Sequence, residues 1–185
     1  KFLHPGPGFG GSCFPKDIEA LFALGNEKKV NLNTISATIN TNNEQKERMS
    51  KKLLKLMGNE VEGKKIAVLG LSFKPNTDDI RESPSQFLIS SLINLKAQIN
   101  SYDPIANSNF KELYPDINYF KNWKDCVSGA DACIIMTEWN EFRGIDLDEL
   151  KRLLKTPILL DTKNIFSIEK LKSLEFKYDN VGRNF

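Results

Sequence analysis

The chain has 185 residues, with 26 Lys and Arg against 24 Asp and Glu, 40% hydrophobic residues and a single His. This composition is typical of a globular protein, and a net charge of +2 provides no strong field that would attract nucleic acid. The apolar runs, such as residues 66–71 and 132–136, have the length of strands, so we predict no membrane span.

The first predicted element is a loop. Residues 1–12 are rich in Gly and Pro, which disfavour helices and central strands because Pro lacks a backbone donor and Gly loses much conformational entropy. A helix should begin near Phe14, with its stop at Gly25 and Asn26. Its apolar residues recur at three-to-four spacing: Ile18, Leu21, Phe22 and Leu24.

A second, long helix is predicted over residues 32–57, and Gly58-Asn59 should end it. Two polar residues within its stripe argue against a coiled coil and favour a helix that packs one face on its neighbours. At 1.5 Å per residue the helix spans about 39 Å, long enough to connect two lobes. The stripe consists of Ile35, Ile39, Asn42, Lys46, Met49, Leu53 and Leu56.

Beyond Gly63, short apolar runs alternate with helical patterns. This alternation predicts an α/β fold, a doubly wound, Rossmann-like parallel sheet whose ligands meet the loops at the carboxyl ends of the strands. We therefore divide the chain into a loop and helical segment, residues 1–58, and a sheet domain, residues 59–185. Strands are expected at 64–71, 97–103, 117–120, 132–138 and 157–162, and helices at 84–95, 107–113, 123–129 and 147–154.

The glycine-rich segment from Gly6 to Gly11 formally matches the dinucleotide-binding pattern G-x-G-x-x-G. We reject this interpretation because His4-Pro5 precedes the glycines, where the pattern requires a strand. The glycines can instead expose backbone N–H groups toward an anionic or sugar-like ligand, and a bare turn is the alternative.

The chain contains three cysteines and no recognisable signal peptide. An odd count argues against a disulfide framework and favours a reducing, cytoplasmic setting, and with His4 as the single histidine we predict no metal site. Cys126 and Cys133 lie in apolar patterns and are interpreted as buried packing residues. Cys13 lies near a helix N-terminus beside Lys16.

That position of Cys13 favours the reactive thiolate form. Asp17, one helical turn further on, can act as a base toward water. A cysteine protease would require a histidine partner, and the lone His4 lies upstream in the loop, so we disfavour that function.

Cations also follow the strand predicted over residues 64–71. Lys74 and Arg81 would lie in the loop at its carboxyl end, where positive charge suits phosphate, although a solvated charge cluster is the simpler alternative. Asp78 and Asp79 are interpreted as shaping this loop or pairing with Arg81, rather than as bases.

Two long motifs resemble those of the UDP-glucose/GDP-mannose dehydrogenase family. Residues 1–17 are similar to its catalytic-cysteine segment, and residues 73–84 are similar to the signature that opens its UDP-binding domain. Three shorter matches follow in the expected order, so the resemblance covers essentially the whole chain: Tyr102-Asp103-Pro104, Thr137-Glu138-Trp139 and Gly182-Arg183.

The resemblance implies oxidation of the C6 alcohol of UDP-glucose to a carboxylate, with two NAD+ as acceptors. Cys13 would attack the intermediate aldehyde, and Asp17 would assist hydrolysis of the resulting thioester. It also implies NAD contacts for Lys16 and Arg81 and a homodimer joined through the long helix. The implied substrate contacts are Phe2, Leu3, Phe9, Gly10, Gly11, Lys74 and Lys163.

Two alternatives stay open: a sibling enzyme that oxidises GDP-mannose or a UDP-N-acetylhexosamine, and a non-catalytic module that binds UDP-sugar or dimerises. Lys163 departs from the family pattern, because members often carry Arg there, so the charge is kept and the bidentate fork is lost. The chain starts at Lys1, just ahead of the catalytic loop. We therefore expect a portion of a longer protein that lacks the N-terminal NAD-binding domain and is inactive in isolation.

Overall fold

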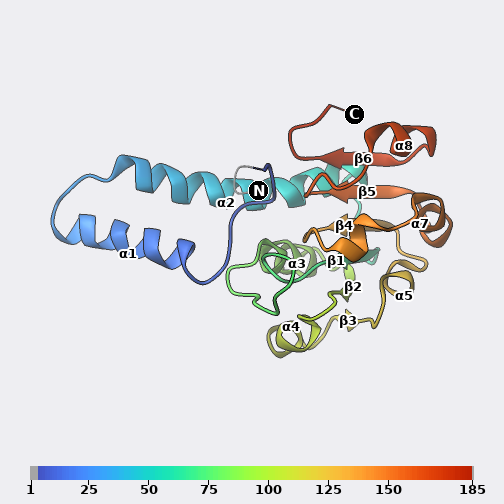
Figure 1. Ribbon diagram of the computed structural model, residues 1–185, viewed down its shortest axis with the longest axis horizontal. Helices are drawn as coiled ribbons and strands as arrows, with labels where there is room; N and C mark the ends of the chain where they lie inside the picture. Colours follow the sequence, from blue (N-terminus) through green and yellow to red (C-terminus); the bar gives the residue numbers. More distant parts are fainter. Residues whose placement is uncertain (1–3, 185) are drawn as a thin grey trace.

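The computed structural model describes residues 4–184, and its centre is a six-stranded sheet (Figure 1). The strand order is β3-β2-β1-β4-β5-β6, and every neighbouring pair is parallel, which confirms the predicted doubly wound fold. The strands are β1 (Lys65–Leu69), β2 (Gln98–Tyr102), β3 (Asn118–Tyr119), β4 (Ala132–Ile135), β5 (Ile158–Asp161) and β6 (Lys177–Asn180).

Helices cover both faces of this sheet, because successive strand residues point to opposite sides. In β1, Ile66 and Val68 pack on one face with the long helix α2 and helices α3 and α4, whereas Ala67 and Leu69 pack on the other. The covering helices are α2 (Asn33–Leu56), α3 (Pro84–Asn94) and α4 (Asn107–Leu113) on the first face, and α5 (Trp123–Val127), α6 (Asn140–Arg143), α7 (Leu147–Leu153) and α8 (Ile168–Ser173) on the second.

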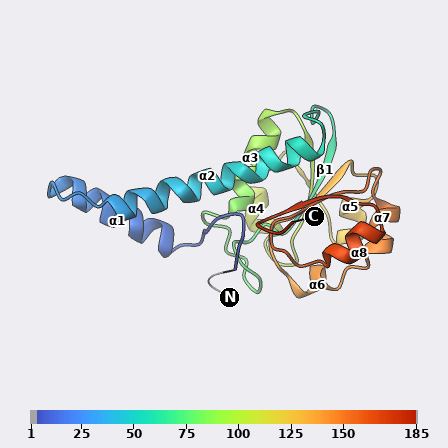
Figure 2. The ribbon, with the colours of Figure 1, turned by 90° about the horizontal axis from the view of Figure 1, so that it is seen from above.

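Helix α1 (Phe14–Glu27) and the first part of α2 form an antiparallel hairpin that projects from the sheet domain (Figure 2). We call this hairpin the arm. The last part of α2 lies on the sheet, where Met49 and Leu53 are buried in its core. Lys52 adds an ion pair of 2.7 Å to Asp179 of β6, so α2 is fixed against the domain. Within residues 4–184, no helix is long and apolar enough to cross a membrane.

The predicted elements agree with the structure for α2 to within one residue at each end and for α4 at both ends. The predicted stop of the first helix at Gly25 is wrong, because α1 continues to Glu27. Gly25 serves packing instead, since a Cβ there would lie 2.6 Å from the Leu32 side chain. Three further elements were not predicted from the sequence: α6, α8 and β6.

Candidate functional site

The glycine-rich loop, residues 4–13, is held on one side by α2. The Asn42 side chain accepts a hydrogen bond from the Phe9 N–H at 2.8 Å and donates one to the Phe9 carbonyl at 3.2 Å. One turn further, Gln45 donates to the Gly6 carbonyl at 2.7 Å. Gly8 lies against the same face of α2, where a Cβ would be 2.9 Å from Asn42 Oδ1. The loop therefore follows the helix closely.

On its other side the glycine-rich loop contacts the β1–α3 loop, residues 70–83. The Gly11 N–H donates to the Arg81 carbonyl at 2.8 Å, and a Cβ on Gly10 would lie 2.2 Å from the Glu82 carbonyl oxygen. Close backbone approach is thus the reason for glycine here. The expectation that the glycine N–H groups face a ligand is wrong for Gly11, because the Arg81 carbonyl already accepts its N–H, and the N–H of the neighbouring Phe9 is likewise bound by Asn42.

Cys13 lies at the end of this loop, as the N-cap of α1, and is exposed. Its carbonyl accepts the Asp17 N–H at 2.9 Å, which places Asp17 one turn along the helix as expected. The Asp17 carboxylate forms an ion pair with the neighbouring Lys16. The hydrogen bond and charge of Asp17 raise the pKa of Lys16, and the Cys13 thiolate adds a smaller contribution.

Arg81 lies in the β1–α3 loop, which contacts the glycine-rich loop through Gly11. Its guanidinium donates to both carboxylate oxygens of Asp79, at 2.9 and 2.8 Å, which confirms the predicted pairing. This contact lowers the pKa of Asp79 and is the main reason why the pKa of Arg81 is raised. The Arg81 carbonyl accepts the Gly11 N–H, so the loop that carries this cation contacts the loop that ends at Cys13.

The two predicted lysine contacts lie in different surroundings. Lys74 is exposed, with Nζ 5.1 Å from the centre of the Phe73 ring. Lys163 follows β5 and is mostly buried, with Nζ 3.0 Å from Glu138 Oε2. The same Nζ lies 4.0 Å from the position that a Cβ on Gly6 would occupy, so Lys163 borders the glycine-rich loop. Burial raises the pKa of Glu138, but the charge and hydrogen bond of Lys163, a backbone hydrogen bond and the Arg143 charge together outweigh it, and the net pKa is lowered. Phe2 and Leu3 lie outside the described residues.

Asp103, at the carboxyl end of β2, organises the start of the β1–α3 loop. It is almost completely buried and accepts six hydrogen bonds, so both oxygens are committed to the protein. Four donors bind Oδ2 and two bind Oδ1: Leu71 N, Ser72 N, Ser72 Oγ and Trp139 Nε1 on the former, and Ile105 N and Ala106 N on the latter.

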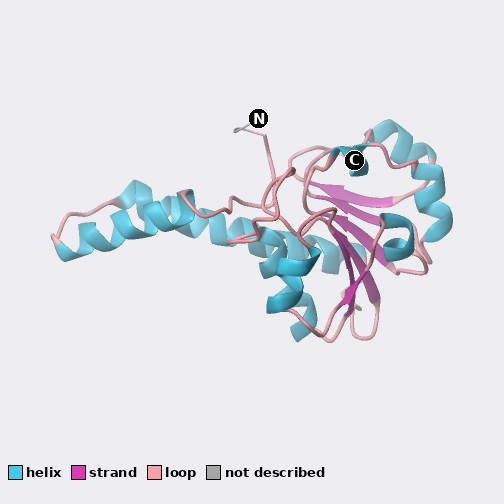
Figure 3. Cartoon of the chain, turned by 60° about the horizontal axis from the view of Figure 1, so that its bottom comes forward, coloured by secondary structure: helices cyan, strands magenta, loops and turns pink. Residues whose placement is uncertain are grey.

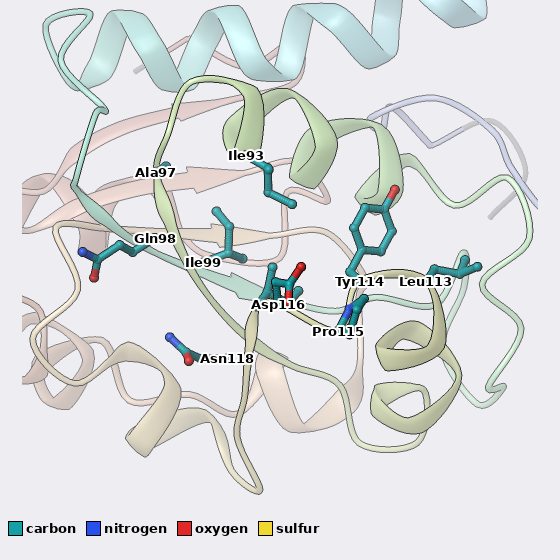
Figure 4. A pocket seen from close by; sticks show the side chains of 10 residues that line it. Ile93, Ala97, Gln98, Ile99, Leu113, Tyr114, Pro115, Asp116 and Asn118 are labelled. Carbon is teal, nitrogen blue, oxygen red and sulfur yellow. The ribbon is translucent and has the colours of Figure 1, made fainter.

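The loops that contact each other gather where the strands end. In Figure 3 the arrowheads of the sheet point toward the loops beside the N-terminal segment, in agreement with the contacts of Gly11 and Gly6. A separate hollow of about 390 Å³ lies at the amino ends of β2 and β3 (Figure 4), away from Cys13. Within residues 4–184, acidic, Cys and His side chains form no group of three that could hold a metal ion.

Three residues of α2 that hold the site were not predicted from the sequence as site residues. Asn42 and Lys46 are buried on α2, Gln45 lies between them, and Lys46 Nζ is 3.5 Å from Glu82 Oε2 in the β1–α3 loop. A signal was present, because Asn42 and Lys46 occupy stripe positions that would otherwise be apolar. Polar side chains at such positions indicate a partner that satisfies them.

Comparison with known proteins places this arrangement among nucleotide-sugar dehydrogenases. A model described as the UDP-glucose/GDP-mannose dehydrogenase family, UDP binding domain, matches residues 67–168, and the central-domain model of that family matches residues 1–44. UDP-glucose 6-dehydrogenase of Rhizobium meliloti is 40% identical over 183 residues, which are 99% of this chain and 42% of the relative.

Solved structures of nucleotide-sugar dehydrogenases are also similar to this chain. A UDP-glucose dehydrogenase from Pyrobaculum islandicum superposes with a TM-score of 0.77 at 28% identity, over 96% of this chain and 38% of that one. A UDP-D-ManNAc dehydrogenase from Pyrococcus horikoshii superposes with a TM-score of 0.81 at 25% identity, over 97% and 40%. The chain spans about two fifths of the length of the curated relatives it matches.

Proposed function

The chain belongs to the UDP-glucose/GDP-mannose dehydrogenase family, and we propose that it forms the central and C-terminal part of a UDP-glucose 6-dehydrogenase. The observation that carries this proposal is the exposed Cys13 at the N-cap of α1, at the end of a glycine-rich loop whose Gly11 N–H is hydrogen-bonded to the Arg81 carbonyl of the β1–α3 loop. The curated relatives named UDP-glucose 6-dehydrogenase support the choice of substrate.

In the proposed reaction, the C6 alcohol first loses a hydride and a proton and becomes an aldehyde. The Cys13 thiolate adds to this carbon, and the oxygen takes up a proton to give a thiohemiacetal. Loss of a second hydride and proton leaves a thioester. Water then adds to the thioester, the C–S bond breaks, and the carboxylate and the free thiol are released. We assign to Asp17 the removal of a proton from that water.

The residues of this chain are suited to making individual contacts to NAD, and not to forming a complete dinucleotide-binding site on their own. The β1–α3 loop carries no G-x-G-x-x-G, and Asp103, placed where such sheets bind a ribose, has both oxygens occupied by protein donors. Arg81 and Lys16 are exposed cations suited to phosphate contacts. When bound, NAD+ would accept the hydrides that leave C6.

We also propose that the arm mediates formation of a homodimer. Leu21, Leu24 and Val30 are 45%, 50% and 55% exposed on this projecting hairpin. Apolar side chains that gather on a projecting element are typical of a protein interface. Three free cysteines fit a reducing compartment, and we propose the cytoplasm.

The decisive experiment compares initial rates of the complete enzyme on UDP-glucose, GDP-mannose and UDP-N-acetylhexosamines. We expect NADH production to be fastest with UDP-glucose. A preference for a UDP-N-acetylhexosamine would favour the sibling function. The similarity to the UDP-D-ManNAc dehydrogenase of Pyrococcus horikoshii supports that alternative. Binding of UDP in calorimetry without oxidation of any of these sugars would indicate a binding module and refute the enzymatic proposal.

A further inference from the structure

One face of α2 contacts both loops of the candidate site. Asn42 and Gln45 bind the glycine-rich loop, and Lys46, one turn beyond Asn42, approaches Glu82 of the β1–α3 loop. These residues are spaced by three and four, so they share one side of the helix. We call Asn42, Gln45 and Lys46 the polar face.

Packing in the core of the sheet domain fixes the position of the polar face. Met49 and Leu53 continue the same stripe toward the C-terminus of α2, and both are buried between the helix and the sheet. The Lys52–Asp179 ion pair joins the same part of the helix to β6. Asn42 lies two turns before Met49 on the same helix, so the packing of Met49 and Leu53 also fixes the position of Asn42.

Within the polar face, Asn42 makes the most hydrogen bonds to the glycine-rich loop. Its side chain is only 8% exposed, and its amide satisfies the N–H and the carbonyl of one residue, Phe9. A residue that pairs with both main-chain groups fixes the position and the orientation of that peptide. Four residues later the chain reaches Cys13, and Gly11 in between is bound to Arg81.

From this arrangement we propose that Asn42 is a positioning residue, which sets the Cys13 thiol in register with the β1–α3 loop and its Arg81. The proposal deepens the proposed function and rests on it for the catalytic consequence. It concerns the geometry of the reacting group, because displacement of a nucleophile by about 1 Å can cost about a hundredfold in rate.

Amide hydrogen exchange on the 185-residue chain tests the contact itself. In the wild-type chain the Phe9 N–H should be protected. Asn42→Ala should accelerate its exchange tenfold or more, whereas Asn42→Asp should keep much of the protection because a carboxylate still accepts from that N–H. Asn43→Ala, at an exposed position on the same helix, is the matched control and should leave the rate unchanged.

Kinetics of the complete enzyme test the consequence. We expect Asn42→Ala to lower kcat tenfold or more with a smaller change in KM, and Asn42→Asp to recover part of kcat. Unchanged Phe9 exchange in Asn42→Ala would overturn the proposal. A kcat of Asn42→Ala within twofold of wild type would also overturn it. So would decreases in kcat that are equal in Asn42→Asp and Asn42→Ala and parallel the decrease in melting temperature.

The two measurements separate this inference from the proposed function. If the wild-type enzyme oxidises no nucleotide sugar, the proposed function fails and the kinetic consequence fails with it, while the exchange of Phe9 still reports on the contact. If wild-type oxidation is normal and the Asn42→Ala variant oxidises equally fast, the function stands and the positioning role is refuted.

Discussion

Replacement of Asp103 by Asn should destabilise the sheet domain strongly. The carboxylate accepts four hydrogen bonds at Oδ2 and two at Oδ1. Asn offers one carbonyl oxygen, so in its better orientation the NH₂ group faces the N–H groups of Ile105 and Ala106, and both lose their acceptor. At about 1–3 kcal/mol for each buried unsatisfied donor, the expected loss is about 2–6 kcal/mol. That is a large fraction of the typical total of about 5–15 kcal/mol.

Urea unfolding followed by circular dichroism measures this loss, as the difference in the free energy of unfolding extrapolated to water. Asp116→Asn changes an exposed carboxylate of the same domain and is the control, expected to shift stability by less than about 0.5 kcal/mol. A loss below about 1 kcal/mol for Asp103→Asn would refute the hydrogen-bond count as the source of stability.

Four further outcomes are expected. Cys13→Ser in the complete enzyme should abolish release of the sugar acid while leaving UDP-glucose affinity within about threefold in calorimetry, because a serine hydroxyl forms little alkoxide at neutral pH; near-normal turnover would contradict the covalent route. Asp17→Asn should slow hydrolysis, so that a thioester-linked sugar accumulates on Cys13 as added mass on the intact protein, and complete absence of any adduct would argue against the assignment of this base. Burial raises the pKa of Asp131, but the Lys65 N–H and the Lys155 ammonium at 2.9 Å outweigh it, and the net pKa is lowered. Ionised Asp131 therefore stabilises the fold above its usual pKa of about 4, and the loss caused by Asp131→Asn, about 1 kcal/mol at pH 7, should diminish in urea titrations as the pH falls below that usual pKa and the carboxylate is protonated; a pH-independent difference would exclude this linkage. If the proposed dimer forms through the arm, Leu24→Asp should convert it to a monomer in light scattering at about 10–50 micromolar, and a wild-type monomer at that concentration would count against the proposal.

Local sequence patterns were sufficient for most of the fold. The alternation of apolar runs with helical periodicity predicts the parallel sheet, because strands and helices impose their own spacing on apolar residues. The N-cap position of Cys13 was also predictable, since Pro15 and the apolar spacing from Ile18 mark a helix start. Strand β6 was missed because its sequence is largely polar, and pairing with β5 rather than apolar patterning makes it a strand.

The sequence by itself thus determined the class of the fold, the family resemblance and the identity of the exposed thiol. Only the tertiary structure decided how that thiol is held. Asn42 binds Phe9 across 33 positions of sequence, and Arg81 meets the same loop from still further along the chain. The periodicity of a helix states which of its residues share a face, but it carries no information about the distant segment that will cover that face. The folded sheet supplies that information, because it brings the carboxyl ends of its strands and the middle turns of α2 to the same place.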